Sequence, residues 1–504
     1  MASLYIFNFD GTSNSPDDAV QEVDFKGQIE DDSITNILKL HLLCGGSLSK
    51  QGKGWLNTQH CYYYAGVGTY GNRIQKALNT LFAPEGTDVR HILRRAIRDF
   101  DSIHFNANKD ILLVTGFSRG AALARRFAKL VSDKVTRPCI YEAVYDTVAS
   151  INAPNLSKRD RPESEVVFEN HSLPKNVLKA LHLVSLDEKR RAFQPTLMNQ
   201  EDKVTEIWFA GAHADVGGGY NKDGLSDNAI SYYMNWLHDL DIGIEIRKAQ
   251  DVDFTSILPF DANYDISEGD IAINPNPLGF SHEQDRWLPL SLVTLCHRFC
   301  CAIENDKIST RIPLVHWSVA NRIYHDQDYR PQSLKNVKHQ LVYNDNERII
   351  CEGIRAHIEL PQQNLTVLKK GETKLITVFA SEMYNRTGLY LQSEKTYTFH
   401  VEDGEKWKDS SIECSAEGWD RANVKLGLRE IPISVMEPFR RVVDANWFEL
   451  CASIGCDDKE VFRIGTEVTH SPKASGEFCP FANDLKRFYG NNQGKIRCLV
   501  KRIE

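Results

Sequence analysis

The chain has 504 residues, 42% of them hydrophobic and 25% charged, with a formal net charge of −8. A chain of this length is too long to fold around one ordinary hydrophobic core, so two or three globular domains are expected. The acidic balance argues against nucleic-acid binding, because a surface that follows phosphates makes a chain basic. No stretch approaches the roughly 18 consecutive apolar residues of a membrane-spanning helix, so any membrane contact is expected to be peripheral.

The amino terminus predicts a strand rather than a secretory signal. MASLYIFNFDGT lacks a basic start and has only a short apolar run. We therefore expect a chain that is cytoplasmic when made and is exported, if at all, by a signal-independent system. The 12 cysteines include no CxxC pair, and free thiols in a reducing compartment are the simplest expectation. CHRFCC (296–301) lies in an apolar segment that is expected to be helical, which argues against metal binding there.

Alternating strand and helix patterns fill the first two thirds of the chain. They predict strands over 3–12, 111–117, 139–148, 180–187 and 205–213, and helices over 87–103 and 121–131. Strands that alternate with helices indicate a mostly parallel sheet covered on both faces. Amphipathic segments within about 221–312 predict a helical, lid-like insertion.

The pattern changes near residue 345. KLITVFASEMYNRTGLYLQSEKTYTFHVED (374–403) is rich in Val, Thr, Tyr and Phe and is broken by turn residues. Such short strands are typical of an all-β sandwich. We predict an α/β domain over 1–340, a linker over 341–364 and a β-sandwich over 365–504.

DILLVTGFSRGAALARRFAKLV (110–131) joins a buried strand to a helix, with Ser118 at the joint. The G-x-S-x-G pattern in this context is typical of a nucleophile elbow. The helix directs its first amides toward the serine, so the amide of Arg119 is a natural oxyanion donor. The loop after the first strand is expected to supply the second donor near Gly11, with Asp10 holding the loop. The alternative is a serine that only caps a helix.

A nucleophilic serine needs a histidine base and a carboxylate that orients it, here in the chain order Ser, Asp, His. Spacing leaves two sets open. They are Ser118–Asp215–His316 and Ser118–Asp146–His213.

Segments spread over about residues 5–335 resemble one family, the α/β-hydrolases that include phospholipase effectors of bacterial type VI secretion. The resemblance is carried by FDGTSN (9–14), TNILKL (35–40), YAGVGTYG (64–71), GFSRGAALAR (116–125), YDTVAS (145–150), LDEKRRAFQP (186–195), WFAGAHADVGGGY (208–220) and VHWSVANR (315–322). It implies an α/β-hydrolase-like fold and a serine esterase of phospholipase A type. Carried over by position, it implies Ser118 as nucleophile, Asp215 as acid and His316 as base, with Asp146 and His213 as substitutes.

The same resemblance implies an antibacterial or defence effector that needs no cofactor for catalysis. Its expected partners are a phospholipid membrane surface and a glycan or a secretion or immunity protein. Ser13 and Trp317 stand where the family usually has Trp and Pro. Two rival functions stay open, a hydrolase of soluble esters or thioesters and a catalytically inactive glycan-binding protein.

The segment 481–503, together with 385–409, resembles the calcium-dependent galactose-binding lectins of PA-I type. In those lectins an Asp and two adjacent Asn hold Ca²⁺. Carried over by position, these ligands are Asp484, Asn491 and Asn492. Clustered oxygen atoms suit a hard cation, although basic residues beside this loop oppose one.

Overall fold

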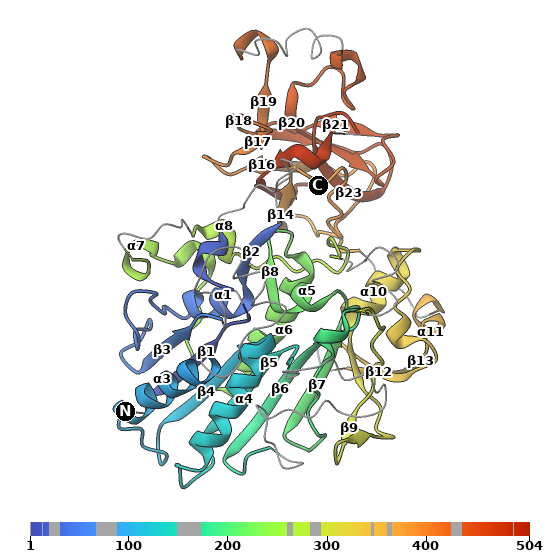
Figure 1. The fold of residues 1–504 in the computed structure, drawn as a ribbon. Coiled ribbons are helices and arrows are strands. Elements are labelled where there is room, and N and C mark those ends of the chain that lie inside the picture. Colours follow the sequence, from blue (N-terminus) through green and yellow to red (C-terminus); the bar gives the residue numbers. More distant parts are fainter. Residues whose placement is uncertain are drawn as a thin grey trace. The chain divides into compact units, whose positions relative to one another are not determined.

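The computed structural model describes residues 2–12, 14–19, 31–66, 88–148, 173–259, 266–282, 294–343, 347–359, 365–424, 436–486 and 488–504. Ser13 and parts of the segments 64–71 and 145–150 lie outside the described residues. The chain forms two compact units, the first with Met1–Val20 and Asp32–Pro361 and the second with Gln362–Glu504 (Figure 1).

A nine-stranded sheet, counted over the described residues, forms the centre of the first unit in the order β13-β12-β11-β7-β6-β5-β4-β1-β3. Its strands are β1 (Leu4–Phe9), β3 (Gln59–Tyr64), β4 (Ile111–Phe117), β5 (Ile140–Tyr145), β6 (Val177–Ser185), β7 (Val204–Phe209), β11 (Leu314–His316), β12 (Lys338–Val342) and β13 (Arg348–Glu352). Neighbouring strands are parallel except β12 and β13. The predicted mostly parallel sheet is confirmed.

Helices cover both faces of this sheet (Figure 1). They include α1 (Asn36–Leu43), α3 (Asp88–Ser102), α4 (Ser118–Ser132), α5 (His213–Gly217), α6 (Gly224–Leu240) and α10 (Trp317–His325). Successive side chains of a strand point to opposite faces, and β1 shows the result. Tyr5, Phe7 and Phe9 pack in a core with α3 and α4, whereas Leu4 and Ile6 pack in a second core with α1 and α6.

The predicted lid-like insertion is helical in part. It contains α6, α7 (Phe254–Ile257) and α8 (Glu268–Ile271). The expected helix over CHRFCC is wrong, because 296–302 are neither helix nor strand and β9 (Ile303–Glu304) follows, paired with β10 (Lys307–Ile308). The backbone of this segment pairs instead with residues 189 and 190.

The segment 341–364, expected as a linker, contains ordered elements of the first unit. The end of β12 lies in it, followed by β13 and α11 (Arg355–Glu359). Antiparallel pairing of β12 with β13 gives the segment a fixed structure that its polar residues did not indicate.

Over its described residues, the second unit has two larger antiparallel sheets and a third, small one. One has the order β14-β25-β16-β22 and the other β15-β23-β20-β19, with β21 beside β20 and a small sheet β18-β17-β24. Their strands are β14 (Thr373–Phe379), β15 (Tyr390–Leu391), β16 (Tyr397–Val401), β17 (Trp407–Asp409), β18 (Ile412–Cys414), β19 (Glu417–Trp419), β20 (Trp447–Ile454), β21 (Val461–Arg463), β22 (Glu467–His470), β23 (Gly476–Ala482), β24 (Asn492–Gln493) and β25 (Lys495–Arg502). One core joins Val378, Phe399 and Val500 of the first sheet to Leu450 and Phe478 of the second. The predicted all-β domain is confirmed.

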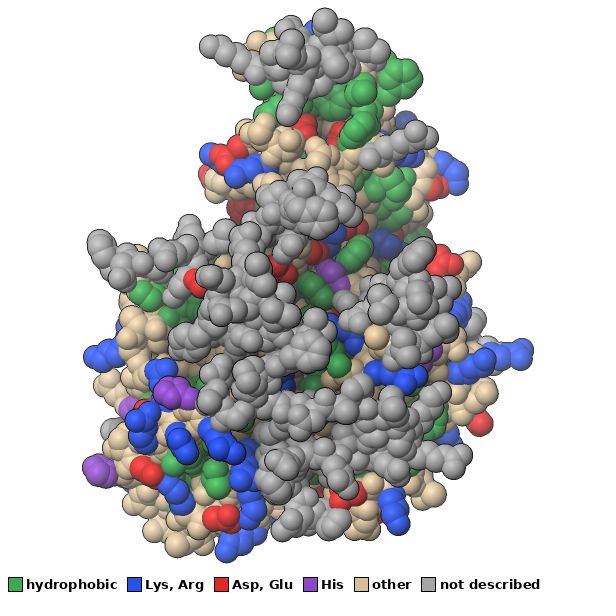
Figure 2. Space-filling model, viewed as in Figure 1, with side chains coloured by type: hydrophobic (Ala, Val, Ile, Leu, Met, Phe, Trp, Pro, Cys, Tyr) green, Lys and Arg blue, Asp and Glu red, His purple; other side chains and the backbone are tan. Residues whose placement is uncertain are grey.

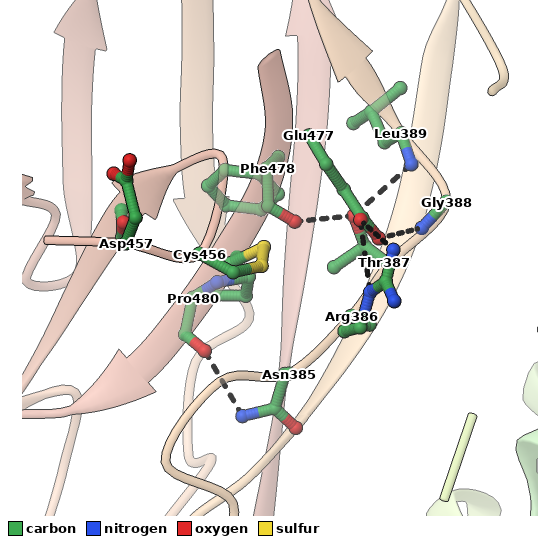
Figure 3. The surroundings of a disulfide bond; sticks show 12 residues. Asn385, Arg386, Thr387, Gly388, Leu389, Cys456, Asp457, Glu477, Phe478 and Pro480 are labelled. Carbon is green, nitrogen blue, oxygen red and sulfur yellow. Dashed lines mark hydrogen bonds and ion pairs between the residues drawn. A yellow bond between two sulfur atoms is a disulfide. The ribbon is translucent and has the colours of Figure 1, made fainter. Parts of the chain in front are cut away.

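A disulfide bond joins Cys456 to Cys479 in the second unit (Figure 3). The expectation of free thiols is therefore wrong for this pair, while the other cysteines are free. Beside the bond, Glu477 accepts hydrogen bonds from the Arg386 guanidinium at 2.9 Å and the Gly388 amide at 3.0 Å (Figure 3). Disulfide bonds such as Cys456–Cys479 form and persist in an oxidising environment.

Candidate active site

Ser118 lies at the joint between β4 and α4. Its φ of +58° is in the left-handed region, which few residues other than glycine adopt and which is common at functional sites. A Cβ on Gly116 would lie 2.5 Å from the carbonyl oxygen of Gly120, and a Cβ on Gly120 would lie 2.2 Å from that of Asp10. Only glycine fits at both positions, and the loop at Asp10 packs directly against the first turn of α4. This is the geometry of a nucleophile elbow.

His213 and Asp146 form a buried pair. His213 follows β7, Asp146 follows β5, and Nδ1 of the histidine lies 2.5 Å from Oδ2 of the aspartate. A carboxylate only accepts, so Nδ1 carries the hydrogen and the neutral ring has a bare Nε2. That Nε2 is buried and has no hydrogen-bond partner among the described residues. Burial lowers the pKa of His213, so this ring is neutral near pH 7 and can take up a proton.

Two contacts place this pair beside Ser118. The amide of Val148, two residues after Asp146, donates to the carbonyl oxygen of Ser118 at 3.2 Å. The ring of His213 lies 4.6 Å from the ring of Phe117, which immediately precedes Ser118. The three side chains therefore gather where β4, β5 and β7 end, at one edge of the sheet.

Arg298, which sequence reasoning did not single out, holds the carboxylate of this pair. Its Nη1 donates to Oδ1 of Asp146 at 2.6 Å and its Nη2 donates to Oδ2 at 2.9 Å. It also donates to the carbonyl oxygens of Ser185, at 2.7 Å, and Phe193, and only 3% of its surface is exposed. Burial acts to raise the pKa of Asp146, but Arg298 and His213 outweigh it and hold this pKa well below its usual range. The one feature of the sequence that could have pointed to Arg298 is its position as a single arginine inside the apolar segment CHRFCC.

The LDEKRRAFQP segment supports His213 from a second side. The His213 amide donates to Oε2 of Glu188 at 3.2 Å, and Arg190 binds the same carboxylate at 2.8 Å. The ring of Phe193 meets the imidazole edge to face at a centroid distance of 5.0 Å. The histidine is thus fixed through its backbone, its ring and its Nδ1.

Asp215 and His316, predicted as acid and base, have different partners. Oδ1 of Asp215 lies 2.6 Å from Nδ1 of His282, and its Oδ2 accepts the amides of Ala212 at 2.8 Å and His282 at 3.0 Å. Nδ1 of His316 lies 2.8 Å from Oγ of Ser318. Strand order explains the difference, because β7, β6 and β5 stand between β11, which ends at His316, and β4.

Asp10 holds the loop after β1, as expected, but it does so by accepting a hydrogen bond from the Gly11 amide. This amide donates to Oδ1 of Asp10 at 2.7 Å, so it is not the predicted second oxyanion donor. Oδ2 of Asp10 accepts the Tyr63 hydroxyl at 2.6 Å, and burial raises the pKa of Asp10 to about 6. Arg119 lies in the first turn of α4, as predicted for the first donor.

Two of the predicted calcium ligands meet in the second unit. Nδ2 of Asn492 donates to Oδ2 of Asp484 at 3.1 Å, while Oδ1 of Asn492 is buried without a hydrogen-bond partner among the described residues. Burial raises the pKa of Asp484. Asn491, at the end of η8 (Tyr489–Asn491), immediately precedes Asn492. Lys486, whose charge opposed a cation in the sequence, binds Asp458 at 2.7 Å.

Comparison with known proteins finds a family similar to part of the first unit. Residues 4–136 and 133–239 match the family described as "T6SS, Phospholipase effector Tle1-like, catalytic domain". The first unit is similar to Tle1-like effectors. This confirms the resemblance predicted from the motifs, and the Tle1-like match includes Ser118, Asp146 and His213. No curated protein matches the sequence at a significant level.

Three solved structures match parts of the chain at low similarity. An uncharacterized protein from Pseudomonas aeruginosa is 19% identical, with a TM-score of 0.33, and the match covers 54% of this chain and 49% of that one. The Tle1 effector bound to the VgrG spike of the Type 6 secretion system is 21% identical, with a TM-score of 0.27 and coverage of 44% and 52%. The PllA-like N-terminal lectin domain of EclA is 21% identical, with a TM-score of 0.18 and coverage of 25% and 94%. The chain thus spans about half the length of the first two proteins.

Proposed function

We propose that this protein is a serine esterase that hydrolyses the acyl esters of phospholipids, with Ser118, His213 and Asp146 as its triad. The observation that carries the assignment is the buried His213–Asp146 pair beside the elbow, with a bare Nε2. The second of the two sets left open by spacing therefore replaces Asp215 and His316. The Tle1-like match supports phospholipids as the substrate class.

In the first step Oγ of Ser118 attacks the acyl carbonyl carbon while Nε2 of His213 takes up its proton. The anionic Asp146 stabilises the imidazolium that forms. The amide of Arg119 and, in place of Gly11, that of Thr12 are proposed to donate to the oxyanion. The imidazolium then gives its proton to the departing alcohol oxygen of the lysophospholipid, and water hydrolyses the acyl-serine by the same route.

Lipid mass spectrometry tests this function. Wild-type protein incubated with bacterial membrane extract should release fatty acid and lysophospholipid, and Ser118→Ala should release neither. Ser132→Ala, a buried serine at the other end of α4, is the matched control. Cleavage of a short-chain soluble ester without release from vesicles would favour the soluble-ester hydrolase. Failure of Ser118 to react with a fluorophosphonate probe would favour the inactive glycan-binding protein.

The Tle1-like match also supports a place in type VI secretion. On this proposal the protein is made in the cytoplasm, leaves by the secretion apparatus and binds a secretion or immunity protein. The Cys456–Cys479 disulfide fits delivery to an oxidising compartment, where such bonds form.

A basic helix face supports contact with a membrane surface. Arg90, Arg94 and Arg98 are exposed and lie four residues apart on α3, so they share one face. Figure 2 shows basic side chains gathered at the left of the first unit, in the region that Figure 1 labels α3. No helix in the described ranges has the length and hydrophobicity to cross a bilayer. We propose peripheral binding to anionic lipid through this face.

Changing Arg90, Arg94 and Arg98 together to Gln should weaken binding to anionic vesicles on the order of 100-fold at low salt. The estimate follows from about 1 kcal/mol for each basic residue near an anionic surface. Vesicle sedimentation measures it, with turnover of a short-chain soluble ester expected to stay unchanged. The control changes three exposed lysines of the second unit to Gln, namely Lys369, Lys370 and Lys395. Equal weakening by both variants would show that only net charge matters.

A second proposed activity is calcium binding by Asp484, Asn491 and Asn492, as in the galactose-binding lectins. The buried, unpartnered Oδ1 of Asn492 beside Asp484 favours it. Ca²⁺ should raise the melting temperature of the wild type but not that of Asp484→Asn, and Mg²⁺ should have a much smaller effect. Isothermal titration without a calcium signal would contradict it, and a galactose column then tests the glycan partner.

A further inference from the structure

Three buried side chains meet at the last elements of the first unit. His339 on β12 and Cys351 on β13 are direct cross-strand partners in the antiparallel register, and His357 comes from α11. Their exposed fractions are 0%, 4% and 1%. One donor atom of each lies within 4.8 Å of the other two, and the two Nε2 atoms are 2.6 Å apart.

The hydrogen bonds around this cluster leave nitrogen lone pairs inside it. Nδ1 of His339 lies 2.9 Å from the carbonyl oxygen of Val337, which only accepts, so Nδ1 donates and Nε2 of the neutral ring is bare. If His357 donates from its Nε2 to this lone pair, its own Nδ1 is bare, buried and without a partner among the described residues. If Nδ1 of His357 carries the hydrogen instead, the bare Nε2 atoms of the two histidines face each other and their lone pairs repel. A cation bound between the two nitrogens removes this repulsion.

We propose that His339 Nε2, His357 Nε2 and the thiolate of Cys351 bind Zn²⁺. Imidazole nitrogen and thiolate sulfur are the ligands that zinc prefers, and the carbonyl that fixes His339 is the usual second partner of a zinc-bound histidine. Bonds of about 2.0 Å to nitrogen and 2.3 Å to sulfur in a tetrahedral arrangement place the ligand atoms about 3.3–3.6 Å apart. The two Nε2 atoms, now 2.6 Å apart, therefore need to move apart by less than about 1 Å to bind the ion. The Cys351 thiol releases its proton to solvent on binding, and water takes the fourth position.

The place of this site in the sheet indicates a structural role. β12 stands five places from β4 in the strand order, so the ion lies apart from Ser118 and takes no part in ester hydrolysis. It would join both strands of the edge hairpin to α11. This inference does not depend on the proposed esterase activity.

Metal analysis of the full-length protein tests the site. Protein expressed with zinc and dialysed should retain about one zinc ion per chain, measured by plasma mass spectrometry. After chelation, Co²⁺ should give tetrahedral d–d absorption and a sulfur-to-cobalt charge-transfer band. Zinc should raise the melting temperature of the stripped protein. Cys351→Ser and His357→Gln should weaken zinc binding on the order of 100-fold or more, whereas Cys300→Ser, another buried free cysteine of the same core, should bind as the wild type does.

Wild-type protein that neither retains zinc nor gives the cobalt charge-transfer band would overturn the proposal. So would zinc that binds both His357→Gln and Cys351→Ser as tightly as the wild type. If Cys351→Ser does not fold, the wild-type cobalt spectrum and His357→Gln decide the question. Equal loss of zinc from Cys300→Ser would also count against the site.

Discussion

His213→Ala should lower kcat on phospholipid on the order of 10⁴–10⁶-fold, as Ser118→Ala should, while His316→Ala should stay within about tenfold of the wild type. The reason is geometric, because among the described histidines His213 alone combines a carboxylate on Nδ1 with a bare Nε2 beside the elbow. Residues that act as one unit are not additive. The double variant of Ser118 and His213 should therefore be no slower than either single variant.

Release of fatty acid from vesicles measures these rates, and melting temperatures confirm that each variant folds. Asp146→Asn should lower kcat by about 10⁴-fold, because the amide favours the wrong tautomer of His213. Asp215→Asn is the matched control, since Asp215 holds His282. The reverse pattern, with His316 and Asp215 essential and His213 and Asp146 dispensable, would restore the assignment carried over from the family.

The rate should depend on pH through the same imidazole. Catalysis needs neutral His213, so kcat/KM rises with pH as the ring loses its proton. Burial lowers the pKa of His213 despite the opposing effect of Asp146, so the midpoint of this rise should lie below the ordinary histidine value of about 6.5. A midpoint above that value would show that the Asp146 carboxylate dominates.

Local patterns in the sequence predicted the elbow, whereas the proposed triad depends on strand order. Gly116, Ser118 and Gly120 lie within five residues, and the steric need for glycine can be read from them directly. The choice between His213 and His316 depends on whether β7 or β11 lies nearer β4. Spacing along the chain carries no such information, so both sets were open.

Two other features were missed because non-local contacts override local signals. The apolar pattern of CHRFCC favours a helix, but pairing with residues 189 and 190 holds the backbone irregular and lets Arg298 reach Asp146. His339, Cys351 and His357 have no recognisable spacing. They come together only through the register of a hairpin in a segment that was predicted to be a linker.

Arg298→Met should reduce stability by about 3–5 kcal/mol and move the pH profile of kcat/KM upward by roughly one unit. The stability loss follows from leaving the Asp146 carboxylate buried without its cation. The pH shift follows because Arg298 lowers the pKa of Asp146 and offsets its negative charge. Without the guanidinium, the carboxylate stabilises the imidazolium more strongly, and the pKa of His213 rises. The midpoint therefore moves to higher pH.

Chemical denaturation and pH–rate profiles measure the two effects, and Arg125→Met provides the control. Arg125 is also buried, on α4, but its Nη1 donates to the carbonyl oxygen of Thr196 at 2.6 Å and not to the triad. Its variant should lose stability while the midpoint of its pH profile stays in place. Arg298→Lys keeps one charge but not the two parallel bonds, so its midpoint should lie between those of Arg298→Met and the wild type. An unchanged midpoint in Arg298→Met would show that Arg298 has only a structural role. An upward shift in Arg298→Met but not in Arg125→Met would show that Arg298 sets the basicity of His213.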